Sequence, residues 1–226
     1  MRPLGSWPVF ITVAIGALLA TACSTIKPST TAPAAAGPYV AGDDESVVVF
    51  HRRSLNGPDT RGDDLPFVER WSYVRVFDSD GAPLADLRAT EHAVVHIKPG
   101  EHQFFVKNWA AEPHPICVAA LKAALDRGRV YAIDIDSAQR DTQVGCEPLR
   151  LIPVERFAIE AFFDHLAKTR SEQKTFLADK RETSIFLDNK LVTDKVILVG
   201  TERLAKRPVA LAPDDGIAWT AEHSGP

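Results

Sequence analysis

The sequence lacks the short motifs that identify many catalytic sites. Its 226 residues contain no Gly-x-Ser-x-Gly nucleophile turn and no His-Glu-x-x-His zinc motif. The ligand spacing of an EF-hand calcium loop is also absent. We therefore expect no enzymatic activity and no cofactor, although a hydrolase site assembled from two distant carboxylates stays open as an alternative.

The sequence also lacks an excess of basic residues. It carries 26 Lys and Arg against 30 Asp and Glu, a formal net charge of −4. Such a mildly acidic chain disfavours nucleic acid as a partner and disfavours electrostatic docking on anionic lipids. With 45% hydrophobic and 25% charged residues, the composition is typical of one globular core with an appendage.

No apolar run is long enough to cross a bilayer. The run from Val9 to Ala20 is shorter than the about 20 residues that a membrane-spanning helix needs. It follows the positive Arg2 and ends in small residues, which is the layout of an export signal. We therefore predict a removable signal peptide over residues 1–22.

The segment 18–24 closes this run with small residues and a single cysteine. It resembles the lipobox of bacterial lipoproteins, a family in which the cysteine is acylated and the signal is cut before it. The resemblance implies diacylglycerol and palmitate on Cys23, and Ser24 implies sorting to the periplasmic face of the outer membrane. Two or more acyl chains anchor stably, at about 0.8 kcal/mol per buried methylene. An ordinary secretory signal, cut after Ala22 to leave Cys23 as a free thiol, is the alternative.

Residues 23–45 are predicted to be a disordered tether. Ser, Thr, Pro and Ala dominate the stretch, which has too little apolar surface to fold on its own. About 22 flexible residues have a reach of roughly 25 Å. The folded part of the chain is therefore expected to begin at Ser46.

Two further cysteines remain beside Cys23. In an oxidising compartment, Cys117 and Cys146 are expected to form a disulfide. The closed loop of about 30 residues would stabilise the fold by roughly 3.5 kcal/mol. A metal site from His114, Cys117 and Cys146 is the alternative, but it has no fourth ligand at a recognisable spacing.

Alternating and β-branched runs over residues 46–152 predict a small antiparallel β-sandwich. In the strand that begins at Trp71, Trp71 and Tyr73 share one face. We expect such an aromatic face to pack inside the sandwich core. A ligand face formed by Trp71, Tyr73 and Trp109 is the alternative, because aromatic rings can stack on sugars or peptides. Residues 116–125 fit either a strand or a short helix.

A turn at Pro99 and Gly100 has the composition of a type II turn. It predicts a hairpin in which paired residue numbers sum to 199, so that one face is almost entirely apolar. This register places His102 on the face opposite His92 and places Lys107 across from His92. A cation beside one histidine disfavours a zinc site, so we expect no bound metal.

Three motifs follow one another in residues 46–136. They are a Gly-bearing turn, a Pro-Gly-x-His hairpin and a Gly-x-x-Tyr strand, found at Asp80-Gly81, Pro99-Gly100-Glu101-His102 and Gly128-Arg129-Val130-Tyr131. This order resembles the small β-sandwich domains of uncharacterised bacterial lipoproteins, which are similar to PEGA-type surface-layer modules. The resemblance implies a sandwich fold and transfers no catalytic residue.

From Pro153 onward the pattern changes to that of a helix. Apolar residues at i, i+3, i+4 and i+7 predict an amphipathic helix that packs on the sandwich, with His165 at the edge of its stripe. Residues 185–187 and 195–199 predict a short strand pair within an appendage that spans residues 153–205. Residues 206–226 are predicted to be a flexible tail. The predicted stripe consists of Val154, Phe157, Ala158, Ala161, Phe162, His165 and Leu166.

The predicted fold class is therefore mainly β with an α appendage, a small antiparallel sandwich followed by an amphipathic helix and a strand pair. The predicted function is a membrane-tethered periplasmic module that binds or scaffolds envelope components without catalysis. Its partners would be the membrane, through the lipid, and an envelope protein or glycan. A glycan-binding accessory module using Trp71, Tyr73 and Trp109 is the main alternative, and an envelope hydrolase is the other.

Overall fold

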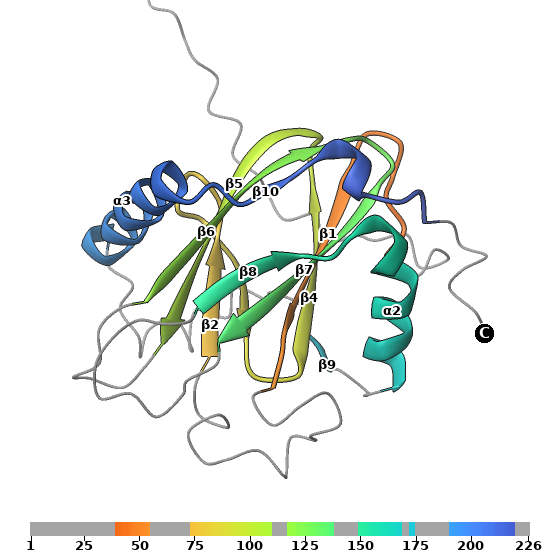
Figure 1. Cartoon of the computed structure of the whole chain (residues 1–226), viewed down its shortest axis with the longest axis horizontal. Helices are drawn as coiled ribbons and strands as arrows, with labels where there is room; N and C mark the ends of the chain where they lie inside the picture. Colours follow the sequence, from red (N-terminus) through yellow and green to blue (C-terminus); the bar gives the residue numbers. More distant parts are fainter. Residues whose placement is uncertain are drawn as a thin grey trace, which may run out of the picture.

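The computed structural model describes residues 39–54, 73–109, 117–137, 149–168, 172–174 and 190–219. In these ranges the chain forms two facing β-sheets, with one α-helix on the outer side of each (Figure 1). The predicted fold class, mainly β with a helical appendage, is confirmed. No helix within the described ranges is long and apolar enough to cross a membrane.

The first sheet, sheet A, has the strand order β8-β7-β1-β4-β9. β1 pairs antiparallel with β4 and parallel with β7, and β9 pairs parallel with β4. The prediction of a purely antiparallel sandwich is therefore wrong. The strands of sheet A are β1 (Ser46–Arg52), β4 (Glu91–Ile97), β7 (Val130–Ser137), β8 (Leu149–Pro153) and β9 (Glu172–Lys174).

The second sheet, sheet B, has the strand order β10-β6-β5-β2-β3. Its central strands pair antiparallel, while β10 pairs parallel with β6. The segment 116–125, which fitted either a strand or a helix, contributes strand β6. The strands of sheet B are β2 (Tyr73–Phe77), β3 (Pro83–Leu87), β5 (Gly100–Trp109), β6 (Val118–Leu125) and β10 (Ala210–Leu211).

The main core lies between the two sheets and follows from the alternation of each strand. In β1, Val48 and Phe50 point inward, and in β5 Phe104 and Val106 do so. Phe50 and Phe104 meet edge to face with ring centroids 5.2 Å apart, a favoured aromatic geometry. One apolar layer therefore joins strands from the beginning, the middle and the end of the described chain, Leu211 of β10 included.

The predicted hairpin around Pro99 and Gly100 is wrong. β4 pairs within sheet A and β5 within sheet B, so this turn carries the chain from one sheet to the other. Gly100 has φ +130°, a conformation that residues with side chains rarely adopt. The predicted position of Lys107 across from His92 is therefore also wrong, because Lys107 pairs with Arg75 in sheet B.

Helix α2 (Ile159–Lys168) covers the outer face of sheet A. A 3₁₀ turn, η2 (Arg156–Ala158), precedes it and resets the helical phase. Phe157 is consequently 85% exposed and Ala161 is exposed as well, so the predicted stripe is wrong at these two positions. The buried stripe begins at the first α-helical residue and consists of Ile159, Phe162, Phe163 and Leu166, which pack on Val47, Val49, Val130 and Ala132.

Helix α3 (Lys190–Lys206) covers the outer face of sheet B. The predicted strand over residues 195–199 is wrong, because these residues lie inside this helix. The helix buries Val196 and Leu204 against Phe77 and Phe105, and this packing outweighs the β preference of the Val and Ile residues. The other predicted strand, 185–187, lies outside the described residues.

Segments expected to be unstructured at both ends of the chain pack in part on the body. Tyr39 packs in the apolar cluster under α2. The predicted disordered tether, residues 23–45, is therefore wrong over residues 39–45. At the other end, β10 pairs with β6, η3 (Pro213–Asp215) follows it, and Ile217 bridges to Val130. The predicted tail is therefore wrong over 210–219. β9 and β10 also complete the two sheets, so the sandwich does not end at residue 152.

Candidate functional site

A row of polar side chains crosses the outer face of sheet A near one end of its strands. The register places His51 of β1 beside His92 of β4 and beside Asp134 of β7. We call these three residues the histidine row. Each has at most 5% of its surface exposed. Alternation along β1 puts His51 on the same face as Val49, which is the face that α2 covers.

Asp134 orients the imidazole of His51. The Nδ1 of His51 lies 2.8 Å from Oδ1 of Asp134, and the Nε of Arg53 donates to Oδ2 of the same carboxylate at 2.7 Å. A carboxylate can only accept, so the proton of His51 is on Nδ1. Nε2 is then the atom of His51 that points away from the carboxylate. A carboxylate that fixes the tautomer of an imidazole is a recurring geometry of general bases.

Helix α2 closes the space next to His51. The ring of His51 lies 5.7 Å from that of Phe162 and 6.2 Å from that of His165. His165 is half-buried, in agreement with its predicted place at the edge of the apolar stripe. Among the described side chains, no hydroxyl or thiol is hydrogen-bonded to Nε2 of His51. The described part of the chain thus contains an oriented imidazole with no nucleophile bound to it.

His92 contacts Tyr39, the first residue that the structure describes. Its Nε2 lies 3.1 Å from the hydroxyl of Tyr39. Burial, and next the charge of His51, lower the pKa of His92 to about 4. Burial also raises the pKa of Tyr39. At neutral pH His92 is therefore uncharged and can accept the proton of the Tyr39 hydroxyl.

A second histidine of β4 makes a matching contact. The Nδ1 of His96 lies 3.1 Å from Oε2 of Glu45. Residues four apart on a strand share a face, so His92 and His96 both lie on the outer side of sheet A. Both histidines of β4 therefore contact the segment that precedes β1.

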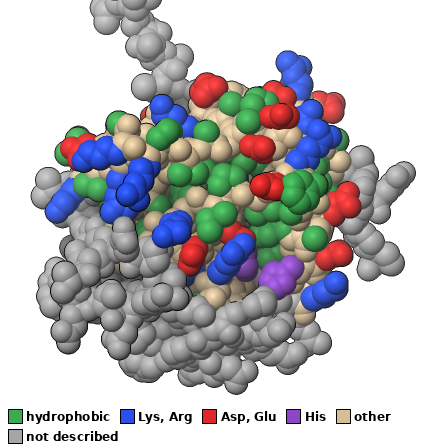
Figure 2. Space-filling view, in the orientation of Figure 1, with side chains coloured by type: hydrophobic (Ala, Val, Ile, Leu, Met, Phe, Trp, Pro, Cys, Tyr) green, Lys and Arg blue, Asp and Glu red, His purple; other side chains and the backbone are tan. Residues whose placement is uncertain are grey.

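The histidines do not form a metal site with the other described residues. In the ranges that the structure describes, no group of three His, Cys, Asp or Glu side chains is placed to hold a metal ion. Histidine side chains reach the surface beside the lower half of α2, next to basic and acidic side chains (Figure 2). The predicted alternative, His114 with Cys117 and Cys146, includes two residues outside the described ranges.

The predicted aromatic ligand face falls at one end of sheet B. Tyr73 of β2 and Trp109 of β5 are direct register partners, and Trp71 lies outside the described residues. Tyr73 is half-buried. In the next row, Arg75 forms a bidentate ion pair with Asp86, with N–O distances of 2.6 and 2.7 Å. Two of the three predicted residues are thus brought together, beside a buried cation.

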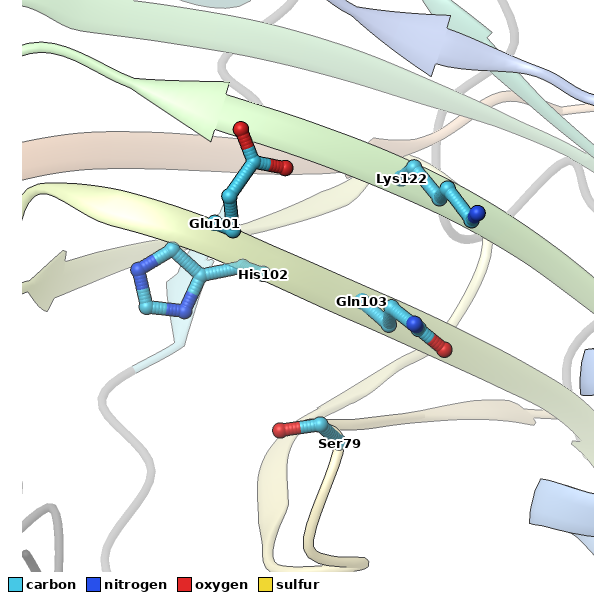
Figure 3. Close-up of a pocket in the computed structure, with 5 residues that line it drawn as sticks. All are labelled: Ser79, Glu101, His102, Gln103 and Lys122. Carbon is cyan, nitrogen blue, oxygen red and sulfur yellow. The ribbon is translucent and has the colours of Figure 1, made fainter.

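An open polar pocket of about 320 Å³ lies elsewhere on sheet B. Figure 3 shows its lining side chains, which come from β5, β6 and the turn after β2 and spread along the strands instead of converging on one point. Nε2 of His102 donates to the carbonyl oxygen of Lys98 at 2.7 Å. The lining mixes hydrogen-bond donors and acceptors: Ser79, Glu101, His102, Gln103 and Lys122.

Of the three cysteines, only Cys117 lies within the described residues. It is 8% exposed, and its backbone N–H donates to Oδ1 of Asn108 at 2.8 Å. Cys23 and Cys146 lie outside the described residues. The pairing with Cys146 and the acylation of Cys23 therefore stay predictions.

Sequence reasoning missed the histidine row. His51 and Asp134 are 83 residues apart, and only the parallel pairing of β1 with β7 brings them together. The sequence contained only a weak signal for this contact. Strand alternation places His51 and Asp134 each on one face of its own strand, but it does not pair the two strands. No family model matches this sequence, and neither the curated proteins nor the solved structures contain a match. The function must therefore be argued from the residues themselves.

Proposed function

We propose that this chain is a non-enzymatic binding or scaffolding module, tethered to the periplasmic face of the outer membrane by lipid on Cys23. The observation that carries the proposal is the docking of Tyr39, sixteen residues after Cys23, on the body. The ring of Tyr39 stacks on Phe163 of α2, with centroids 4.4 Å apart. The proposal assigns residues 24–38 to the tether between lipid and body, and about 15 flexible residues have a reach of roughly 20 Å.

The polar pocket of sheet B is the surface that we assign to partner contact. It is open to solvent, and it offers both signs of charge as well as neutral hydrogen-bonding groups. Such a mixture suits a polar partner surface, because each polar group of the partner can find a complementary group. Lysine and arginine side chains also gather over neighbouring α3 (Figure 2).

Photo-cross-linking in intact cells tests this assignment. A photoreactive residue replaces Lys122 in the pocket, and a matched variant carries it at Glu160, which is exposed on α2. We expect a reproducible envelope component on position 122 and not on position 160. Cys23→Ala should remove the adduct, because the body would leave the membrane. Equal labelling from both positions, or none from position 122, would contradict the scaffold proposal.

A glycan-binding role is the second candidate, and the direct pairing of Tyr73 with Trp109 favours it. Adjacent aromatic residues at a sheet end can offer a platform for a sugar ring. Peptidoglycan fragments should then shift the tryptophan fluorescence in a saturable way. Tyr73→Ala should abolish the shift, and Trp219→Phe should preserve it, because Trp219 packs on Phe163 at the other sheet. A flat titration would remove this candidate.

A further inference from the structure

The segment before β1 is held on the body by two histidines of one strand. We call residues 39–45 the N-terminal strap. At its start the Tyr39 hydroxyl lies 3.1 Å from Nε2 of His92, and at its end Oε2 of Glu45 lies 3.1 Å from Nδ1 of His96. The two histidines are on the same face of β4, so the strap follows the outer face of this strand.

The two ends of the strap are attached differently. Tyr39 is held through its side chain, by the hydrogen bond to His92 and the stacking on Phe163. Glu45 is built into the backbone network, because its carbonyl oxygen accepts from the Gly128 N–H at 2.7 Å. Its own N–H donates to the carbonyl oxygen of Gly42 at 3.1 Å. The first end can therefore leave the body without breaking a strand.

We propose that the N-terminal strap is a latch that acid opens: a proton on His92 detaches residues 39–44, and Glu45 stays in place as the hinge. Detachment itself does not require the lipid. Only its consequence, a longer tether, rests on the proposed function. Six released residues add up to about 20 Å of reach at full extension.

The surroundings of His92 decide the direction of the effect. A proton on His92 puts a charge into a buried position beside a second imidazole, while the carboxylate of the row is already bound by His51 and Arg53. Detachment exposes His92 to water and removes much of this cost, so acid favours the open strap. The contacts of His92 include Tyr39 of the strap and His51, its register partner on β1. His51 in turn contacts Asp134 of β7 and His165 of α2, and the backbone of β9 pairs with β4 on its other side.

The hinge falls at Glu45 because this residue is attached through its backbone as well as its side chain. Its carbonyl oxygen accepts from the Gly128 N–H, and its carboxylate contacts His96. β1 stays in sheet A because its pairing with β4 and β7 begins after the hinge.

A distance measurement between spin labels tests the latch. The full-length mature protein, in detergent, carries labels at Val40→Cys in the strap and at Ala161→Cys on the exposed side of α2. We expect one narrow distance distribution at pH 7.5 and a second, longer and broader population at pH 4.5. The ratio of open to latched protein should rise by up to about tenfold per pH unit, the limit for one proton.

Two histidine variants separate the latch from general acid effects. His92→Gln should make the distance distribution independent of pH, while His102→Gln, a histidine of sheet B, should respond like the wild type. An unchanged distance at pH 4.5, or the same pH response in His92→Gln, would overturn the proposal. Loss of the far-ultraviolet β signal together with the distance change would also overturn it, because the whole fold and not the strap would then be opening. The lipid at Cys23 is tested separately by labelling, so failure of one proposal does not hide failure of the other.

Discussion

The imidazole of His51 and the carboxylate of Asp134 are neighbours on parallel strands, with Nδ1 and Oδ1 2.8 Å apart. Both side chains are buried under α2, where an unsatisfied polar atom would be costly. The bond therefore ties β1 to its neighbour β7 in one register. A shift by one residue would move Asp134 to the opposite face and leave His51 without its acceptor.

Removing the carboxylate should destabilise the fold. Asp134→Ala leaves the buried Nδ1–H of His51 without an acceptor, for which we expect a loss of about 2–3 kcal/mol in the free energy of unfolding. Urea denaturation at pH 7 measures this loss. Glu160→Ala, an exposed change on α2, should stay within about 0.5 kcal/mol. Equal stabilities for the two variants would show that the pair does not hold the register.

Stability should fall with acid because of His92. Its pKa of about 4 in the folded protein lies below the ordinary histidine value of 6.5, so the unfolded chain binds more protons between these values. The contribution of His92 is complete above pH 6.5 and declines as the pH falls to 4, by on the order of 2–3 kcal/mol. Urea denaturation at pH 7, 5.5 and 4.5 should show a smaller decline for His92→Gln than for the wild type. Parallel curves would contradict the buried neutral state of His92.

Gly200 should not tolerate a side chain. A Cβ at this position would lie 2.3 Å from Cδ1 of Phe105, so α3 would have to move away from sheet B. We expect Gly200→Ala to cost about 1–3 kcal/mol, as overpacked cores do. Gly42→Ala is the matched control, because its Cβ would meet nothing closer than 3.6 Å. Thermal unfolding compares the two, and a neutral Gly200→Ala would contradict the described packing of α3.

The disulfide predicted between Cys117 and Cys146 can be tested by mobility. Non-reducing gels should show faster migration than reducing gels, and Cys146→Ser should remove the difference. The variant should also lose about 3 kcal/mol of stability, because the loop of about 30 residues is no longer closed. Cys23→Ser should keep the mobility difference. Identical migration of the wild type under both conditions would point to free thiols.

The positions of the strands were easier to predict from the sequence than the pairing between strands. Phe104 and Val106 could be assigned to an apolar face from alternation alone, whereas the uniformly apolar run from Val47 to Phe50 predicted a strand without showing which face is inner. The partner of each strand could not be assigned, because Pro99 and Gly100 are as suitable for a crossing between sheets as for a hairpin. Residues 195–199 failed for another reason. Their β-branched composition is local, whereas the surface of Phe77 and Phe105 that turns them into a helix is distant in sequence.

The candidate site was harder to predict than the fold. The face shared by Trp71 and Tyr73 followed from alternation, but its link to Trp109 required the pairing of β2 with β5. The histidine row required three strands and a helix at once, and the false hairpin had removed His92 from consideration. Phe157 shows the same limit at a smaller scale, since one 3₁₀ turn changed which side of the helix is buried.

Metabolic labelling of Cys23 tests the tethered module most directly. Cells that express the full-length protein are grown with labelled palmitate, and the protein is recovered from the membrane fraction. We expect label on the wild type and on His92→Gln, and no label on Cys23→Ala, which should move to the soluble fraction. An unlabelled wild-type protein, or a label that survives Cys23→Ala, would contradict a lipid anchor at this residue.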